Sequence, residues 1–243
     1  MIKADPNLKY TDLLEPLHEM WRLSGIKIEA LQNRWNPKYG PPVVTRAGKY
    51  TSRTWTSWTE GFVYGSALLQ FDATSDQKFL ELGRRLTFER MPNHLTDRGV
   101  HDHGFNNVST YGNLWRMTGE GNSVSHGDRE VCELALRVSG AVQAMRWTNT
   151  DRGHGFIHSF NGPQSLFVDT IRSLRSLAIS HKLGHVFIGE QVQHISLLER
   201  LVHHALVTAQ FSVYYGKGRD VYDVRGRTAH EILFNPTNGT YRA

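Results

Sequence analysis

Residues 58–71, WTEGFVYGSALLQF, decide how the rest of the chain is interpreted. When this stretch is wound as a helix, apolar and small side chains fall on nearly every face, whereas a surface helix has one apolar stripe. Such a helix is enclosed by other helices. A turn with an N-cap at Asp76 follows, and the next segment carries Phe79, Leu82 and Leu86 on a single stripe. The predicted unit is therefore an inner helix followed by an outer helix.

The same unit recurs twice more along the chain. In each case an apolar segment precedes a segment whose apolar residues repeat at i, i+3, i+4 and i+7. The inner segments are residues 58–71, 104–117 and 166–179, the outer segments cover residues 79–86, 131–145 and 195–209, and loops are expected at 118–122 and 182–184. A first helix over residues 10–33 precedes the three hairpins, although Pro16 and Gly25 weaken its pattern.

Hairpins with inner and outer members form a closed α/α toroid or an open solenoid. The links before the second and third inner segments, residues 92–100 and 148–163, are long and rich in Gly, Asn, His and aromatic residues. Long loops gathered on one face usually build a site, and a solenoid keeps its connections short. The sequence therefore predicts an all-α fold, an α/α six-hairpin toroid. We expect one incomplete domain over residues 1–243, with about seven of the twelve helices that closure needs.

The C-terminal part of the chain has a different pattern. Residues 221–234 alternate and are rich in β-prone side chains, and residues 235–239 (NPTNG) have the composition of a turn. A short β-hairpin is expected here.

Composition and charge restrict the possible partners. With 243 residues and 39% apolar content the chain can bury a sizeable core, which excludes a disordered protein. No segment approaches the roughly 20 apolar residues of a membrane span, and the N-terminus lacks a signal-like apolar run, so we expect a cytoplasmic protein without a membrane partner. The formal net charge of +5 suits an acidic partner. Because the basic residues are scattered and form no nucleic-acid motif, an acidic saccharide is the expected partner and nucleic acid is not.

Cysteine and histidine spacing argues against a metal or cofactor. Cys132 is the only cysteine and lies on a helix pattern, so we expect it to be a buried small hydrophobe. His181 and His185 have the i, i+4 spacing of zinc ligands, but no Glu follows His181 and Gly184 indicates a helix end. No metal and no cofactor are predicted.

Three candidate site residues stand at the starts of the inner segments, namely Trp58, Asp102 and Asp169. If these segments are parallel neighbours, an aromatic ring and two carboxylates meet at one mouth. An Asp at a helix start is usually a cap, and a Trp in this position is as easily a core residue. The residue pattern alone therefore leaves structural and catalytic roles open.

Four motifs in order resemble those of a known family. They are WTEGFVYG at residues 58–65, HDHGF at 101–105, VDT at 168–170, and His230 ahead of FNPTNG at 234–239. Their order and approximate spacing resemble the unsaturated glucuronyl hydrolases of glycoside hydrolase family 88, from about Trp55 to the last residue. The family pattern continues with further Gln-Gly-Tyr and Trp-x-Arg-Gly-x-x-Trp stretches, which is a second reason to expect an incomplete domain.

The resemblance implies a function and a role for each matching residue. It implies removal of an unsaturated (Δ4,5) uronic acid from the non-reducing end of lyase-generated oligosaccharides, by hydration of the double bond. Asp169 would be the general acid and base, Asp102 the second essential acid, and Trp58 a stacking wall for the sugar. His230 would contact the same pocket. His101 flanks Asp102 and is a further candidate substrate contact, with structural hydrogen bonding as the open alternative.

An acid that delivers a proton near neutral pH needs a raised pKa. Burial or a neighbouring carboxylate raises the pKa of a carboxyl, whereas a helix N-terminus lowers it by less than about one unit. If Asp169 is the general acid, desolvation and repulsion from Asp102 must therefore outweigh the helix dipole there.

Two other functions stay open at this point. A sugar epimerase or isomerase on the same barrel would rely on His pairs in place of the two acids, and an inactive helical binding fragment would need none of them. Exposed inner helices would also favour self-association.

Overall fold

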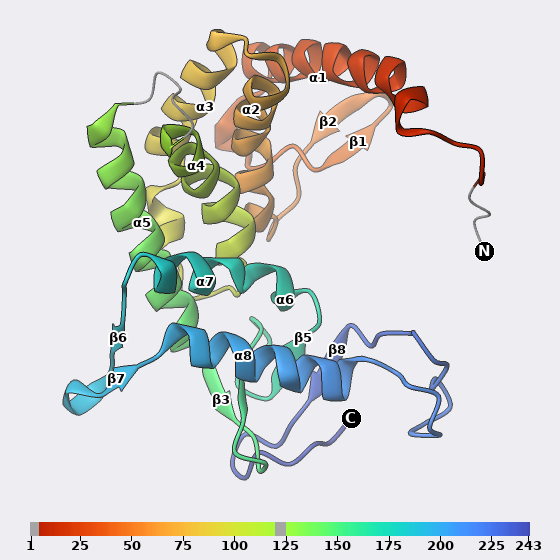
Figure 1. Ribbon diagram of the computed structural model, residues 1–243, viewed down its shortest axis with the longest axis vertical. Coiled ribbons are helices and arrows are strands. Elements are labelled where there is room, and N and C mark those ends of the chain that lie inside the picture. The colour runs from red at the N-terminus through yellow and green to blue at the C-terminus, as the bar shows by residue number, and fades with distance from the viewer. Residues whose placement is uncertain (1–4, 120–124) are drawn as a thin grey trace.

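The computed structural model describes residues 5–119 and 125–243, which form successive helical hairpins (Figure 1). The helices are α1 (Leu14–Arg34), α2 (Glu60–Thr74), α3 (Gln77–Arg90), α4 (Asn113–Gly119), α5 (His126–Met145), α6 (Thr170–Ser173), α7 (Arg175–Lys182) and α8 (Leu197–Val207). Short 3-10 helices are η1 (Tyr10–Leu13), η2 (Pro37–Tyr39), η3 (Ser57–Thr59), η4 (Pro92–Leu95) and η6 (Glu190–Val192), and η5 (Gly104–Gly112) and η7 (Thr208–Ser212) are π-helical.

Strands occur only as short antiparallel pairs in the described residues. They are β1 (Val44–Arg46) with β2 (Lys49–Thr51), β3 (Trp147–Asn149) with β4 (Gly155–Ile157), β5 (Ser165–Phe167) with β8 (Glu231–Leu233), and β6 (Phe187–Ile188) with β7 (His194–Ile195). The prediction of an all-α fold is confirmed. When η5 is joined to α4 and α6 to α7, the described helices make seven segments, as the pattern predicted.

The alternation of inner and outer helices is present in the structure. α2 buries side chains on most of its faces, and its Leu68 and Phe71 pack with Phe79 and Leu86 of α3 in the largest core cluster. Cys132 of α5 lies in the same cluster and is fully buried, as expected. Burial raises the pKa of its thiol to about 12, so the thiol stays protonated.

The inner segments approach one another through glycines. A Cβ atom added to Gly61 of α2 would lie 2.4 Å from the Cα of Asn106 in η5. A Cβ added to Gly104 of η5 would lie 2.4 Å from the Cα of Ser173 in α6. Both distances are shorter than any ordinary carbon contact, so only glycine lets these three backbones pack so closely. The starts of the inner segments are thereby held side by side.

The start of the third inner segment differs from the prediction. Residues 166–179 were expected to be helical, but Leu166 and Phe167 belong to the strand β5, and the helix begins at Thr170. All three strand residues are buried, and a short apolar run such as Leu166-Phe167-Val168 does not distinguish a strand from a buried helix.

The expected short β-hairpin near the C-terminus is present. The predicted turn at residues 235–239 returns the chain, so that Phe234 bridges Tyr241 and the N–H of Asn235 donates to the carbonyl of Thr240. β8 also pairs with β5, with Phe167 opposite Glu231. The β5–β8 pair brings two distant parts of the chain together, and the Val168 N–H donates to the carbonyl of His230 at 2.8 Å.

Three smaller outcomes complete the comparison. The first helix runs unbroken through Pro16, which lies in its first turn, and through Gly25, which packs against Gln70 of α2. The second inner segment is π-helical over Gly104–Gly112, and α4 continues through Gly119, so the predicted loop starts later than expected and its residues 120–122 lie outside the described part of the chain. Within the described residues, no helix combines the length and the apolar character needed to cross a bilayer.

Candidate active site

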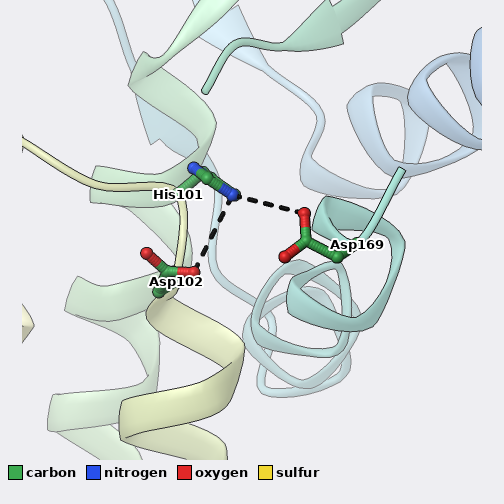
Figure 2. Close-up of side chains that lie close together, drawn as sticks. All are labelled: His101, Asp102 and Asp169. Carbon is green, nitrogen blue, oxygen red and sulfur yellow. Dashed lines mark ion pairs between the residues drawn. The ribbon is translucent and has the colours of Figure 1, made fainter. Parts of the chain in front are cut away.

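Asp102 and Asp169 lie side by side with His101 between them (Figure 2). Nε2 of His101 is 3.8 Å from Oδ1 of Asp102 and 3.5 Å from Oδ1 of Asp169. One side-chain atom from each of the three residues lies within 4.8 Å of the others. These separations allow strong charge interactions but exceed a good hydrogen bond. The structure therefore brings together both acids and the histidine that the sequence singled out.

The local backbone explains how the acids meet. Asp102 precedes η5 and Asp169 precedes α6, and these two segments are the ones joined by the Gly104–Ser173 contact. The carbonyl of Asp102 accepts hydrogen bonds from the N–H groups of Phe105 and Asn106, while the side chain of Asp169 caps no N–H of its helix. The side chain of Asp169 therefore does not have the structural role of an N-cap, which the sequence had left open.

The two carboxyls are in different electrostatic environments. Asp102 is only 4% exposed, and burial raises its pKa, with the nearby charge of Asp169 acting in the same direction against His101 and Arg146. Burial also acts to raise the pKa of Asp169, but the positive charges of His101, His230 and Arg172 outweigh it and lower that pKa below its ordinary value. Because the 3.5 Å gap is long for a hydrogen bond, we attribute the influence of His101 on Asp169 mainly to charge.

The condition for Asp169 to act as an acid is not met in the ligand-free protein. Desolvation prevails at Asp102 and not at Asp169, because Asp102 is more deeply buried and has fewer cationic groups beside it. In the ligand-free protein, Asp102 is therefore the member of the pair that holds a proton more readily, and Asp169 is the member that ionises more readily.

His101 faces the acids from a fully enclosed position. Its side chain is 1% exposed, and neither ring nitrogen has a hydrogen-bond partner among the described residues. The ring stacks on Phe160 with centroids 5.7 Å apart and meets the edge of Phe167 at 5.3 Å. Buried polar atoms are nearly always paired, so an imidazole left unpaired between two carboxylates makes His101 a candidate functional residue.

The second histidine beside Asp102 has a structural role. Nε2 of His103 donates to the carbonyl of Asp97 at 2.8 Å, and Nδ1 lies 3.1 Å from Oγ of Ser139. Burial lowers the pKa of His103 to about 4, which keeps the ring neutral. His103 thus anchors the preceding loop, and His101 alone of the two turns to the acids.

His230 lies nearer to the two acids than Trp58 does. The β5–β8 pair places His230 next to Val168, and its ring lies 4.7 Å from that of Phe167. The half-exposed ring of Trp58 packs near Phe62 and Phe105, with centroids 6.4 and 6.3 Å away. Phe105 lies one helical turn after Asp102, so Trp58 borders the site through Phe105.

Two groups of site residues carried no recognisable sequence signal. The buried Arg146 donates to the carbonyls of Arg98, His158 and Ser159. It thereby connects the loops at residues 92–100 and 148–163, which precede the second and third inner segments. An Arg at a helix C-terminus is ordinary, and nothing in the pattern marks it as a clamp. The second group is aromatic, since the exposed Trp55 meets Phe160 edge-on with centroids 4.8 Å apart. Trp55 thereby extends the aromatic surface that Phe160 and Phe167 form beside His101.

The same three residues are the described group that could hold a metal ion, because His101, Asp102 and Asp169 each offer one ligand atom. His181 and His185 do not share a helix face. α7 ends at Lys182, and Gly184 turns the chain with a φ of 75°. The interpretation of Gly184 as a helix end is correct.

Sequence comparison and structure comparison give different results for this chain. No family profile matches the sequence, and no curated protein matches it either. The structure is similar to that of an unsaturated glucuronyl hydrolase specific for heparin, with a TM-score of 0.71, 17% identity, and coverage of 93% of this chain and 53% of that chain.

Two further solved structures of the same kind are similar. An unsaturated glucuronyl hydrolase from Bacillus sp. GL1, responsible for the degradation of glycosaminoglycan, gives a TM-score of 0.64 at 19% identity, covering 91% of this chain and 54% of that one. One from Streptococcus agalactiae gives 0.66 at 17% identity, covering 100% and 57%. The chain thus spans about half the length of these proteins. What the likeness shows at such identities is the fold, and the chain has the α/α toroid fold of these structures over most of its length.

Proposed function

We propose that this chain is a glycoside hydrolase that removes a Δ4,5-unsaturated uronic acid from the non-reducing end of lyase-generated oligosaccharides. The observation that carries the proposal is the pair of carboxylates from two inner segments, within 4.8 Å of each other and flanked by His101. The fold shared with unsaturated glucuronyl hydrolases supports it. So does the independent match of four motifs that contribute both acids.

The chemistry needs one group that gives a proton and takes one back. Asp169 protonates C4 of the double bond, and its carboxylate then accepts a proton from the water whose oxygen bonds to C5. The carboxyl is thereby restored, and C5 carries both the ring oxygen and a hydroxyl. Such a hemiketal opens to a ketone, which frees C1 as a hemiacetal and releases the rest of the saccharide. Asp102 is the second essential acid, and the burial that raises its pKa disfavours a second negative charge beside Asp169.

The pKa directions fit this cycle once the substrate is included. In the free protein the cations around Asp169 lower its pKa, which favours the base form. An anionic uronate bound beside it offsets those charges and raises the pKa of Asp169, so that it takes up the proton that C4 needs. Proton uptake is then coupled to substrate binding.

The other proposed roles follow from position. His230 and His101 contact the sugar at the acid pair, and Trp58 supplies a stacking surface one turn away. We propose that residues 1–243 act as a single domain. Apolar side chains on the inner helices, such as Leu69 and Ile171, are partly exposed and form a surface for self-association. The molar mass measured by light scattering tests this proposal: a dimer supports it, and a monomer contradicts it.

The paired acids also favour hydrolysis over the alternatives. An epimerase would rely on a His pair, yet His103 is committed to Asp97 and Ser139. A binding module would have no reason to leave His101 buried and unpaired beside two acids.

The test is to incubate the purified chain with an unsaturated uronyl disaccharide and follow the ultraviolet absorbance of its double bond. The matched control is the saturated disaccharide, in which product release is followed by chromatography. We expect absorbance to fall and the neutral sugar to be released from the unsaturated substrate only. An unchanged absorbance, or interconversion without cleavage, would refute the proposal.

A further inference from the structure

The acid pair and His101 have the composition and spacing of a metal-binding site. Nε2 of His101 lies 3.5 Å from Oδ1 of Asp169 and 3.8 Å from Oδ1 of Asp102, and Figure 2 shows this nitrogen directed toward both carboxylates. Ligand bonds of about 2.0–2.2 Å at a tetrahedral zinc ion place neighbouring ligand atoms roughly 3.3–3.6 Å apart. The observed distances are close to this separation, so one ion can contact all three side chains after small side-chain rotations.

The histidine supplies an observation that is independent of the two acids. His101 is 1% exposed, and neither of its ring nitrogens has a hydrogen-bond partner among the described residues. A buried polar nitrogen usually has a partner, and a neutral imidazole carries on one nitrogen a lone pair that it can donate to a metal ion. A cation between the acids therefore supplies the partner that Nε2 lacks.

The ligand set selects the class of ion. One imidazole nitrogen and two carboxylate oxygens suit zinc and similar transition metals, whereas magnesium prefers six oxygen ligands in an octahedron and keeps several waters. The side chain of Asp169 is 27% exposed, so an ion can reach the three ligands from solvent. The sequence showed no signal of this set, because His101 and Asp102 are adjacent and Asp169 is remote, whereas zinc motifs have fixed short spacings.

Neighbouring groups make the expected binding reversible. Nδ1 of His101 has no acceptor to orient the ring, although a metal-bound histidine usually has one. The positive charges of Arg146 near Asp102 and of His230 near Asp169 also oppose a cation. A chelator should therefore remove the ion readily.

We infer that His101, Asp102 and Asp169 together bind zinc or a similar divalent transition-metal ion, and that this ion blocks the acid pair. The blocking role rests on the proposed function, in which Asp169 gives a proton to C4 and takes one from water. A carboxylate of Asp169 that is bound to the ion cannot carry this proton. Zinc is then a reversible inhibitor that competes with the unsaturated saccharide.

The test is a calorimetric titration of the wild-type chain with zinc chloride, which measures binding without any saccharide. We expect one tight site per chain, and magnesium chloride should bind far more weakly. Asp169→Asn is the main variant, because Asp169 is partly exposed and the protein should fold. Changing a group that only supports a ligand weakens metal binding by roughly 10- to 100-fold, so the loss of a ligand should weaken it by at least about 100-fold.

Other histidines provide matched controls, because a chain with many histidines can bind zinc elsewhere. The rings of His154 and His203 have centroids 4.8 Å apart, and Nδ1 of the exposed His126 lies 3.6 Å from Oε1 of Glu130. His203→Gln and His126→Gln should both keep the tight site. Zinc binding that is unchanged in Asp169→Asn, or that is lost in either control, would overturn the inference.

X-ray absorption of the zinc-loaded wild type gives a second measurement that does not depend on the folding of a variant. We expect one imidazole and carboxylate oxygens among the ligands, at about 2.0–2.2 Å. A spectrum with two or more imidazoles would place the ion at another site and contradict the inference.

Turnover separates this inference from the proposed function. Zinc should slow the loss of double-bond absorbance, and excess chelator should restore the rate. If zinc binds through Asp169 but the double bond is never consumed, even with chelator present, the proposed function fails and the metal site stands. If the double bond is consumed and saturating zinc leaves the rate unchanged or raises it, the blocking role fails and the proposed function stands.

Discussion

Substitution of Gly104 by alanine is expected to separate the two acids. A Cβ atom at this position would lie 2.4 Å from the Cα of Ser173 and 2.9 Å from its carbonyl oxygen. Both contacts are with backbone, so no side-chain rotation relieves them. Because carbon atoms pack at about 3.5 Å or more, η5 and α6 must move apart by about 1 Å.

Two consequences of different size follow from this shift. Overpacking of this kind destabilises a protein by about 1–3 kcal/mol, and each kcal/mol lowers the melting temperature of a domain of this size by roughly 2–4 °C. A misplacement of about 1 Å between reacting groups lowers kcat/KM on the order of 100-fold. The loss of activity at a permissive temperature should therefore be much larger than the loss of folded protein.

The assay is the loss of double-bond absorbance, measured beside thermal unfolding. The matched control is Gly83→Ala, where the added Cβ would lie 2.6 Å from the Leu68 side chain, in the α2–α3 contact away from the acids. Both variants should lose stability, but only Gly104→Ala should lose most of its kcat/KM. Equal activity losses in the two variants, or full activity in Gly104→Ala, would refute the reasoning.

Three further predictions concern charge and exposure. Burial raises the pKa of Asp102, so ionisation of this carboxyl reduces the stability of the folded protein as the pH rises. The Asp102→Asn protein should therefore melt no lower than wild type at neutral pH, and any gain in melting temperature should vanish below about pH 3. A loss of stability that is constant with pH would contradict this. Arg84 lowers the pKa of Asp128 through two 2.7 Å hydrogen bonds, so Arg84→Met should lower the free energy of unfolding, measured in urea, by about 1 kcal/mol at pH 7. This loss of stability should disappear as acid protonates Asp128. A loss that persists in acid would show that the Arg84–Asp128 ion pair is not its cause. Trp58→Ala should change stability by less than about 1 kcal/mol but raise KM for the unsaturated disaccharide, with Trp58→Phe close to wild type; an unaltered KM would exclude the stacking role.

Much of the fold could be predicted from the sequence because helical burial leaves a regular signal. The spacing alone predicts that α2 is apolar on nearly every face and that α3 has one apolar stripe. The same contrast locates the other inner segments, although the third helix begins at Thr170 and not at residue 166. The adjacency of Asp102 and Asp169 followed from that placement together with the motif order. These are consequences of local periodicity.

What could not be predicted depends on contacts between distant parts of the chain. A three-residue strand such as β5 is too short to show a period, and its partner β8 is remote in sequence. That pairing brings His230 near Asp169, where it contributes, with His101 and Arg172, to lowering the pKa of Asp169. The clamp formed by Arg146 consists of side-chain bonds to main-chain carbonyls, for which no residue pattern is required.

The most direct test of the account compares Asp169→Asn with wild type in the consumption of an unsaturated uronyl disaccharide, with binding measured in parallel. The control is Asp151→Asn, which removes an exposed carboxylate elsewhere. The account predicts that Asp169→Asn still binds the disaccharide but consumes its double bond roughly 10²- to 10⁴-fold more slowly, while Asp151→Asn matches wild type. An Asp169→Asn protein that consumes the double bond at the wild-type rate would contradict it.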